Sequence, residues 1–300
     1  MENHMKRHPK RRKWESTEIV SVIVLTILLI LIVIPFWNAL VISLETNAAY
    51  GRQPFSWLPG EWTLENYTYL FQSGQAMLTG YKSTVCITLI GTLFGMIIMV
   101  MGAYAFSRSF PGKKALFRIM LFTMFFSGGV IPMYLMLKEM KLLNTYEAIV
   151  LLNLVNVYNI IVMKNGFDSI PVEMEEAAKI DGANDFTIFI RVMLPLQKPL
   201  LATFTLFTAV AYWNTWYWPL ITLSGSKKTV LQLYLRSMIS AVDSSENGGL
   251  LSAAGAASAS SFSQGIKMAS VFLTMLPIML VYPFLQKYFV KGVMIGAVKM

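Results

Sequence analysis

Few side chains in this sequence have the spacing that covalent chemistry requires. The two histidines, His4 and His8, lie near the N-terminus, and no set of metal ligands or of nucleophile and base falls within the apolar runs. No Gly-x-x-x-x-Gly-Lys-Ser/Thr sequence occurs, so the chain has no P-loop to hold nucleotide phosphates. We therefore expect no catalytic residue, no metal and no cofactor, and the chemistry that remains is that of binding.

The residues best suited to bind a partner form the polar segment Glu176–Pro195, which lies between strongly apolar runs. Pro171 suits the first turn of a helix, where its missing N–H costs nothing, and acidic residues follow near the positive end of the helix dipole. Gly182 is placed to end this helix in a left-handed conformation. Asn184 or Asp185 can then cap a second helix.

The second helix of this segment has an apolar face of its own. The face is expected to consist of Phe186, Phe189, Ile190 and Met193. Pro195 is expected to end the helix before the next apolar run. The whole loop 164–198 carries four basic and six acidic residues, a formal charge of −2. An acidic loop is repelled by anionic lipid, so a soluble protein partner explains it better than an amphipathic hairpin on the membrane surface.

The elements that hold this loop are membrane spans. Hydrophobic residues form 55% of the 300-residue chain and charged residues 14%, which indicates an integral membrane protein. Six runs contain no Asp, Glu, Lys, Arg or His: Ile19–Leu44, Ser83–Ser107, Ile119–Leu137, Ala148–Met163, Pro199–Ser226 and Met268–Gln286. Each is long enough for a spanning helix, the fourth if it begins at Thr145. The runs are continuous, so we predict an all-α, six-span protein rather than a barrel.

Basic residues set the orientation of these spans. The chain carries a net charge of +9, placed mainly in the basic tail 1–18, between the second and third runs, and after the last run. The positive-inside rule makes these three places cytoplasmic and puts both termini inside, so the excess charge needs no nucleic acid. The permease domain is then 19–300, with the loop 164–198 in the cytoplasm and the long loop 227–267 outside.

Several local patterns refine this layout. A short surface helix is expected near Glu65–Phe71, another helix over Thr229–Ile239, and a flexible, Ser/Ala/Gly-rich stretch over 252–264. Ser127-Gly128-Gly129 before Pro132 predicts a bend in the third span. Gly91 and Gly95 have the spacing that lets two helices approach closely. The lone Cys86 is interpreted as a small apolar packing residue.

The polar segment resembles the EAA loop of ABC-importer permeases. The positions that carry the resemblance are Glu176, Ala177, Ala178, Gly182, Val192, Leu194 and Pro195. Two further stretches, Gln286–Lys299 and Trp213–Trp216, resemble the type I carbohydrate-uptake branch of these permeases, which act in the plasma or inner membrane.

This resemblance implies a set of partners and roles. A second permease chain, expected to be a distinct homologue, would complete the pore in the lipid. Two ATPase subunits would bind the ATP, and an extracytoplasmic binding protein would deliver the sugar. Glu176, Ala177, Ala178, Asp181, Gly182, Ala183, Leu194 and Pro195 would couple the chain to the ATPase. Within the branch, the chain looks like the subgroup that handles complex or acidic oligosaccharides.

Two groups of residues are candidates for the sugar path. Trp213 and Asn214 lie deeper than Trp216–Trp218, which fit an interfacial aromatic belt. A second group, Asn153, Asn156 and Asn159 with Tyr158, has a three-residue step that would keep the amides on one side of a helix. Interhelical hydrogen bonding and pore lining both remain open for these amides.

The main alternative is an ion-coupled secondary transporter of a small solute. Such a protein usually places ionisable residues in the membrane core, and the six runs contain none.

Overall fold

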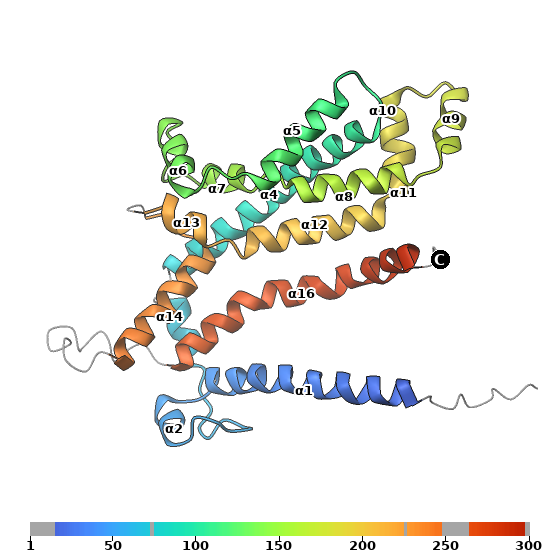
Figure 1. The fold of residues 1–300 in the computed structure, drawn as a ribbon. Helices are drawn as coiled ribbons and strands as arrows, with labels where there is room; N and C mark the ends of the chain where they lie inside the picture. Colours follow the sequence, from blue (N-terminus) through green and yellow to red (C-terminus); the bar gives the residue numbers. More distant parts are fainter. Residues whose placement is uncertain (1–15, 73–74, 225–226, 248–263, 298–300) are drawn as a thin grey trace, which may run out of the picture.

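The computed structural model describes residues 16–72, 75–224, 227–247 and 264–297, and in these ranges the chain is helical (Figure 1). Three helices are long and apolar enough to cross a membrane by themselves: α1 (Ser16–Ser43), α4 (Gln75–Ser107) and α16 (Gln264–Ala297). If each of three bent helix pairs forms one further span, the number of candidate spans is six. By helix length and composition, the predicted all-α, six-span architecture is confirmed.

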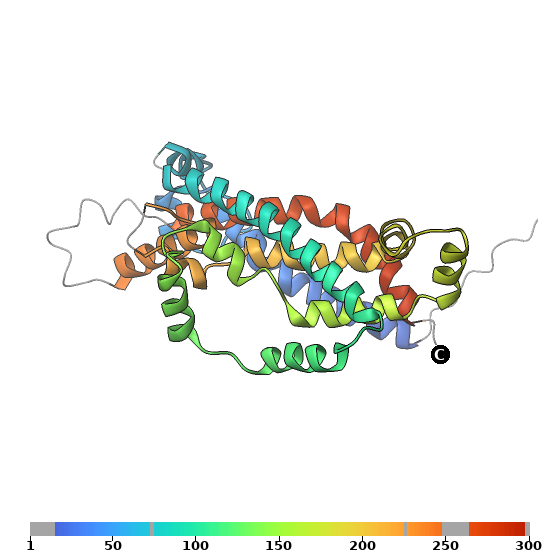
Figure 2. The same ribbon diagram turned by 90° about the horizontal axis from the view of Figure 1, so that it is seen from above.

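The first bent pair is the third predicted span. It consists of α5 (Lys113–Phe125) and α6 (Val130–Glu139), whose axes differ by 113°. Gly129 has φ 84°, a conformation that glycine adopts without strain, and it immediately precedes α6. The bend predicted from the two glycines and Pro132 is confirmed. Figure 2 shows this pair at the edge of the bundle, where α5 contacts α8.

The fourth predicted span is also broken. It consists of α7 (Tyr146–Leu152) and α8 (Val157–Asp168), bent by 49°. The interpretation of Asn153, Asn156 and Asn159 as one helical face is therefore wrong. Asn153 caps the end of α7, and the Asn156 carboxamide oxygen accepts a hydrogen bond from the Asn159 backbone N–H at 3.2 Å as the N-cap of α8. The Asn156 cap starts a new helix at this point, so the three amides do not share one continuous helix.

The fifth predicted span is α12 (Lys198–Trp213), followed after a short break by α13 (Tyr217–Thr222). A further bend of 81° separates α12 from the helical segment before it, which contains α10 (Asp185–Ile188), a π-helical turn (Phe189–Met193) and α11 (Leu194–Leu196). Pro195 is the penultimate residue of this helical segment, which ends at Leu196 before the bend, so the expectation that Pro195 ends the helix before the next span is confirmed to within one residue.

Helix α4 is the centre of the bundle and packs against α7, α8 and α12. Two glycines allow this close approach: a Cβ at Gly91 would lie 2.4 Å from the Tyr212 ring, and a Cβ at Gly95 would lie 2.9 Å from the Leu154 carbonyl oxygen. The packing role predicted for the glycine pair is confirmed, with each glycine facing a different element. Cys86 on the same helix is exposed, so its interpretation as a packed residue is wrong within this chain.

Two buried clusters mark the two ends of the bundle. The first joins α4, α8 and α12 to the segment after α9, and its most buried members are Ala103, Met163, Ile188 and Met193. The second joins α3 (Glu65–Gln72) and α4 to α14 (Leu231–Asn247) and α16 through Leu70, Met77, Tyr234 and Ala269.

The first-described end of α1, the last-described end of α16, and the helices α9 (Val172–Ile180) and α10 lie together at one end of the molecule (Figures 1 and 2). Helices α2 (Asn47–Arg52), α13 and α14 lie at the other end. This arrangement agrees with an even number of spans. The surface helices expected near Glu65–Phe71 and Thr229–Ile239 are confirmed as α3 and α14, whereas 252–263 and 1–15 lie outside the described residues.

Candidate functional site

Helix α9 and the turn after it form a compact, locally determined unit. Pro171 precedes α9, and Glu173 and Glu175 lie in its first turn. Gly182 has φ 80°, and the helix ends in a Schellman motif: the Gly182 N–H donates to the Lys179 carbonyl at 3.0 Å, and the Ala183 N–H donates to the Ala178 carbonyl at 3.0 Å. The left-handed position predicted for Gly182 is confirmed.

The helix that follows is capped by Asn184, whose carboxamide oxygen accepts a hydrogen bond from the Thr187 backbone N–H at 2.8 Å. The apolar face predicted for it is only partly correct. Met193 is buried and Phe189 half-buried, whereas Phe186 and Ile190 are exposed. The π-helical turn has more residues per turn than an α-helix, so the buried face does not follow the regular α-helical period. Ile188 is buried, in place of Phe186 and Ile190.

The residues predicted to contact an ATPase divide into an exposed and a packed set. Glu176, Ala177, Asp181 and Gly182 are exposed. Ala178, Ala183 and Leu194 are half-buried against the α4–α8–α12 cluster, whereas Pro195 on α11 is exposed like the first set.

Ile180 was not singled out in the sequence, yet it is 85% exposed and lies on α9 beside this exposed set. The exposed surface of α9 therefore combines carboxylates, a small alanine surface and apolar side chains, of which Ile180 is the most exposed.

A partly buried ion pair fixes α9 to the membrane helices. Glu175 is 8% exposed, and its carboxylate forms a salt bridge with the Arg108 guanidinium and another with the Lys179 ammonium at 2.8 Å. Arg108 follows the end of α4, and its guanidinium lies 4.6 Å from the centre of the Tyr104 ring. Arg108 therefore links the last turn of the central helix directly to α9.

The electrostatics of this link favour the charged state. Burial tends to raise the pKa of Glu175, but the hydrogen bond from Lys179 and the charges of Arg108 and Lys179 outweigh it and hold the pKa below its usual value. The same hydrogen bond and the charge of Glu175 raise the pKa of Lys179. The sequence showed the Glu175–Lys179 spacing, but Arg108 was interpreted only as a residue that sets orientation.

The loop is also closed at its ends. The Gln197 side-chain amide donates a hydrogen bond to the Gly166 carbonyl at 2.6 Å, which joins the end of α8 to the start of α12. A Cβ at Gly166 would lie 2.3 Å from the end of the Leu200 side chain and 3.0 Å from Gln197 Oε1, so a larger residue there would require these side chains to shift. The segment between these contacts is held as one unit.

The residues predicted for a sugar path lie at the two breaks in the spans. The Asn153 side-chain amide donates to the Ile149 carbonyl at 3.1 Å, whereas Asn156 and Tyr158 are exposed. Trp213 is buried, with its indole N–H donating to the Thr274 carbonyl at 3.2 Å, and Asn214 is exposed in the break after α12. The structure therefore places Trp213 in the packing between α12 and α16 and leaves Asn214 accessible.

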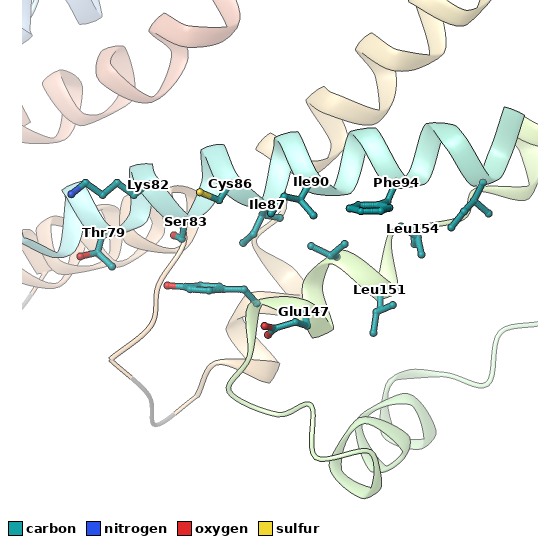
Figure 3. Close-up of a pocket in the computed structure, with 13 residues that line it drawn as sticks. Thr79, Lys82, Ser83, Cys86, Ile87, Ile90, Phe94, Glu147, Leu151 and Leu154 are labelled. Atoms are coloured by element: carbon teal, nitrogen blue, oxygen red, sulfur yellow. The ribbon is translucent and has the colours of Figure 1, made fainter. Parts of the chain in front are cut away.

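A groove of about 790 Å³ runs between α4 and α7 (Figure 3). Its walls are mostly apolar and include Ile87, Ile90, Phe94 and Leu151, with Lys82 and Glu147 also lining it. Cys86 lies in this wall, which accounts for its exposure. Such a surface suits lipid or another apolar helix rather than a hydroxyl-rich solute. No cluster of three or more potential metal-ligating side chains occurs among the residues that the structure describes.

A family model, individual relatives and a solved structure all show similarity of this chain to transport permeases. The family described as "Binding-protein-dependent transport system inner membrane component" matches residues 88–295. The chain is 39% identical over 271 residues to the polygalacturonan/rhamnogalacturonan transport system permease protein YtcP of Bacillus subtilis, covering 89% of this chain and 92% of the relative. It is 25% identical over 272 residues to the arabinooligosaccharides transport system permease protein AraQ of Halalkalibacterium halodurans, covering 89% and 91%.

A solved structure is also similar. It is described as a bacterial ABC transporter involved in the import of the acidic polysaccharide alginate, and one of its chains superposes with a TM-score of 0.80 at 30% identity. The match covers 93% of this chain and 100% of that chain.

Proposed function

This chain belongs to the family of binding-protein-dependent transport system inner membrane components, and from that premise we propose that it is a pore-forming permease subunit of an ATP-driven importer of acidic oligosaccharides. The observation that carries the proposal is α9, an exposed acidic helix that a partly buried ion pair fastens to the central membrane helix. A pore subunit without a nucleotide site of its own needs such an element to receive motion from a partner.

The exposed part of α9 has the chemistry of a protein contact. Glu176 and Asp181 supply carboxylates for basic side chains of a partner, and Ala177 lets the partner backbone approach. Ile180 supplies an apolar anchor of the kind that fills a pocket at the centre of an interface. We assign this surface to an ATPase subunit that binds the ATP, so the chain itself requires no cofactor. Two such subunits and a second permease would complete the complex.

The proposed direction of coupling follows from how α9 is attached. A push on α9 is transmitted through Glu175 to Arg108 and the end of α4, and through Ala178 and Ala183 to the cluster around α8 and α12. These helices contain or contact the interrupted fourth and fifth spans. Movement of the loop can therefore change the arrangement of the breaks where Asn156 and Asn214 are exposed.

The substrate class rests on the relatives. YtcP is named for polygalacturonan and rhamnogalacturonan, and the solved transporter for alginate, which its description calls acidic. We extend this class to the present chain, with an extracytoplasmic binding protein as the source of the sugar. The cell membrane is the proposed location, with both termini and α9 on the cytoplasmic side.

An ATP-dependence assay tests the proposal. The chain is co-produced with its candidate ATPase and second permease, reconstituted into vesicles, and supplied with binding protein and labelled oligogalacturonate. Uptake is expected to require ATP and to persist when the proton gradient is collapsed. Uptake that follows a proton or sodium gradient without ATP would instead establish the ion-coupled alternative.

A further inference from the structure

A hollow of about 470 Å³ lies at the end of the molecule opposite α9, between α13, the segment 227–229 and α14. Three cationic side chains line it: Lys227, Lys228 and Arg236. We call it the cationic hollow. No Asp or Glu is among the described residues that line it, whereas the hydroxyl-bearing residues Thr229, Tyr234, Ser237 and Ser240 are. Its volume falls in the range of about 300–1,000 Å³ typical of small-molecule sites.

Aromatic rings hold two of these cations in position. The Arg236 guanidinium lies 4.2 Å from the centre of the Trp216 ring, and the Lys228 ammonium lies 5.3 Å from the centre of the Tyr146 ring. An aromatic face orients a cation but carries no net charge, so the positive charge of the Arg236 guanidinium is not cancelled as it would be by a carboxylate. A stacked guanidinium also keeps its N–H edges available for a planar, two-point hydrogen bond.

The cationic hollow adjoins the accessible break after α12. The Gln232 side-chain amide donates a hydrogen bond to the Asn214 carboxamide oxygen at 3.2 Å. Arg236 follows Gln232 by one helical turn of α14 and contacts Trp216, two residues after Asn214. The same face of α14 therefore presents both the guanidinium and the amide to the end of the fifth span.

We propose that the cationic hollow binds the carboxylates of an acidic oligosaccharide at the outer mouth of the path, with Arg236 as the principal specificity-determining residue. This inference rests on the proposed function and deepens it by naming the side chains that select the acid. Arg236 and Lys227 bind the carboxylate, serine hydroxyls of the hollow accept hydrogen bonds from sugar hydroxyls, and Asn214 receives the next sugar unit. A neutral oligosaccharide has no carboxylate to pair with Arg236 and Lys227.

The test measures direct binding, so that it does not depend on uptake. The assembled transporter in lipid nanodiscs is titrated with trigalacturonate and with the neutral trisaccharide maltotriose, both without nucleotide and with a non-hydrolysable ATP analogue. For trigalacturonate, Arg236→Gln and Lys227→Gln are each expected to raise the Kd about five- to tenfold, with Arg236→Lys closer to the wild type. Lys141→Gln, which removes an exposed cation elsewhere, is the matched control and is expected to leave the Kd unchanged.

Three results would overturn the inference. The first is an unchanged Kd for trigalacturonate in Arg236→Gln. The second is an equal loss for maltotriose, which would indicate a structural role. The third is intact binding of trigalacturonate combined with lost association of the binding protein, which would assign the hollow to that protein. ATP-driven uptake of oligosaccharide by the wild type would persist in all three cases, and its absence is what would refute the proposed function.

Discussion

The link between Arg108 and Glu175 predicts that a single substitution outside the contact surface weakens the hold of the membrane helices on α9. In Arg108→Gln the Glu175 carboxylate, which is 8% exposed, keeps only Lys179 as an ionic partner. A hydrogen bond to a charged group contributes about 1.5–3 kcal/mol. Because Arg108 is partly exposed and Lys179 remains, we expect the lower limit, about 1.5 kcal/mol, which is about a tenfold change in the equilibrium between docked and released α9.

Hydrogen exchange of the assembled transporter measures this equilibrium directly. Backbone amides of Val172–Ile180 are expected to exchange about tenfold faster in Arg108→Gln, while amides of α8 and α12 stay at the wild-type rate. Substrate-stimulated ATP hydrolysis should fall, and basal hydrolysis by the ATPase should not. The matched control is Asp168→Asn, which removes the more exposed ion pair with Lys164 and should change exchange by less than about twofold.

A double-mutant cycle separates the ion pair from general damage. If the cost arises from leaving the Glu175 charge buried, adding Glu175→Gln to Arg108→Gln should recover part of the protection of α9. Wild-type exchange in Arg108→Gln would refute the idea that this pair anchors α9. Losses that simply add in the double variant would show that the two side chains act independently.

Three other predictions concern the loop and the packing of the spans. The pKa of Glu175 is lowered in the folded protein. The contribution of its carboxylate to stability is therefore fully present above the ordinary glutamate pKa of about 4.3 and is lost as the pH falls through the lower, folded-state pKa. Hydrogen exchange of α9 measured against pH should show this loss in the wild type and not in Glu175→Gln. Gly182→Val is expected to cost about 1–2 kcal/mol at a φ of 80° and to reduce coupled transport at normal expression, whereas Gly182→Asn should retain more activity; equal uptake by both variants would contradict this reasoning. Asn156→Leu removes the cap of α8 and should lower stability by about 1 kcal/mol, with Asn156→Asp close to the wild type in a thermal-unfolding assay.

The sequence was sufficient where local chemistry determines the structure. Gly182 and Asn184 behave as predicted because a helix end depends on the backbone conformation and capping groups of a few adjacent residues. The bend before α6 was predictable for the same reason, from two glycines followed by Pro132. The six-span layout followed from uninterrupted apolar runs, which few other structures can bury.

Other features required tertiary information. The Asn153–Asn159 pattern has helical spacing, yet capping at Asn156 separates α7 from α8, and periodicity alone does not distinguish the two outcomes. The partnership of Arg108 with Glu175 joins residues 67 positions apart, so no local pattern could indicate it. The burial of Trp213 beside an exposed Asn214 depends on where α16 packs, which composition does not specify.

The bend between α5 and α6 has a consequence for how the cell must make this protein. Helix α5 has no buried residue within the chain, and in α6 only Leu137 is buried. Non-helical backbone between them cannot be left facing hydrocarbon, because lipid offers no hydrogen-bonding groups. A newly inserted chain therefore carries a non-helical segment between α5 and α6 that needs to be covered by another protein. Orphan copies are expected to be recognised and degraded by membrane proteases, so a stable supply of this chain would require matched synthesis of the second permease proposed above.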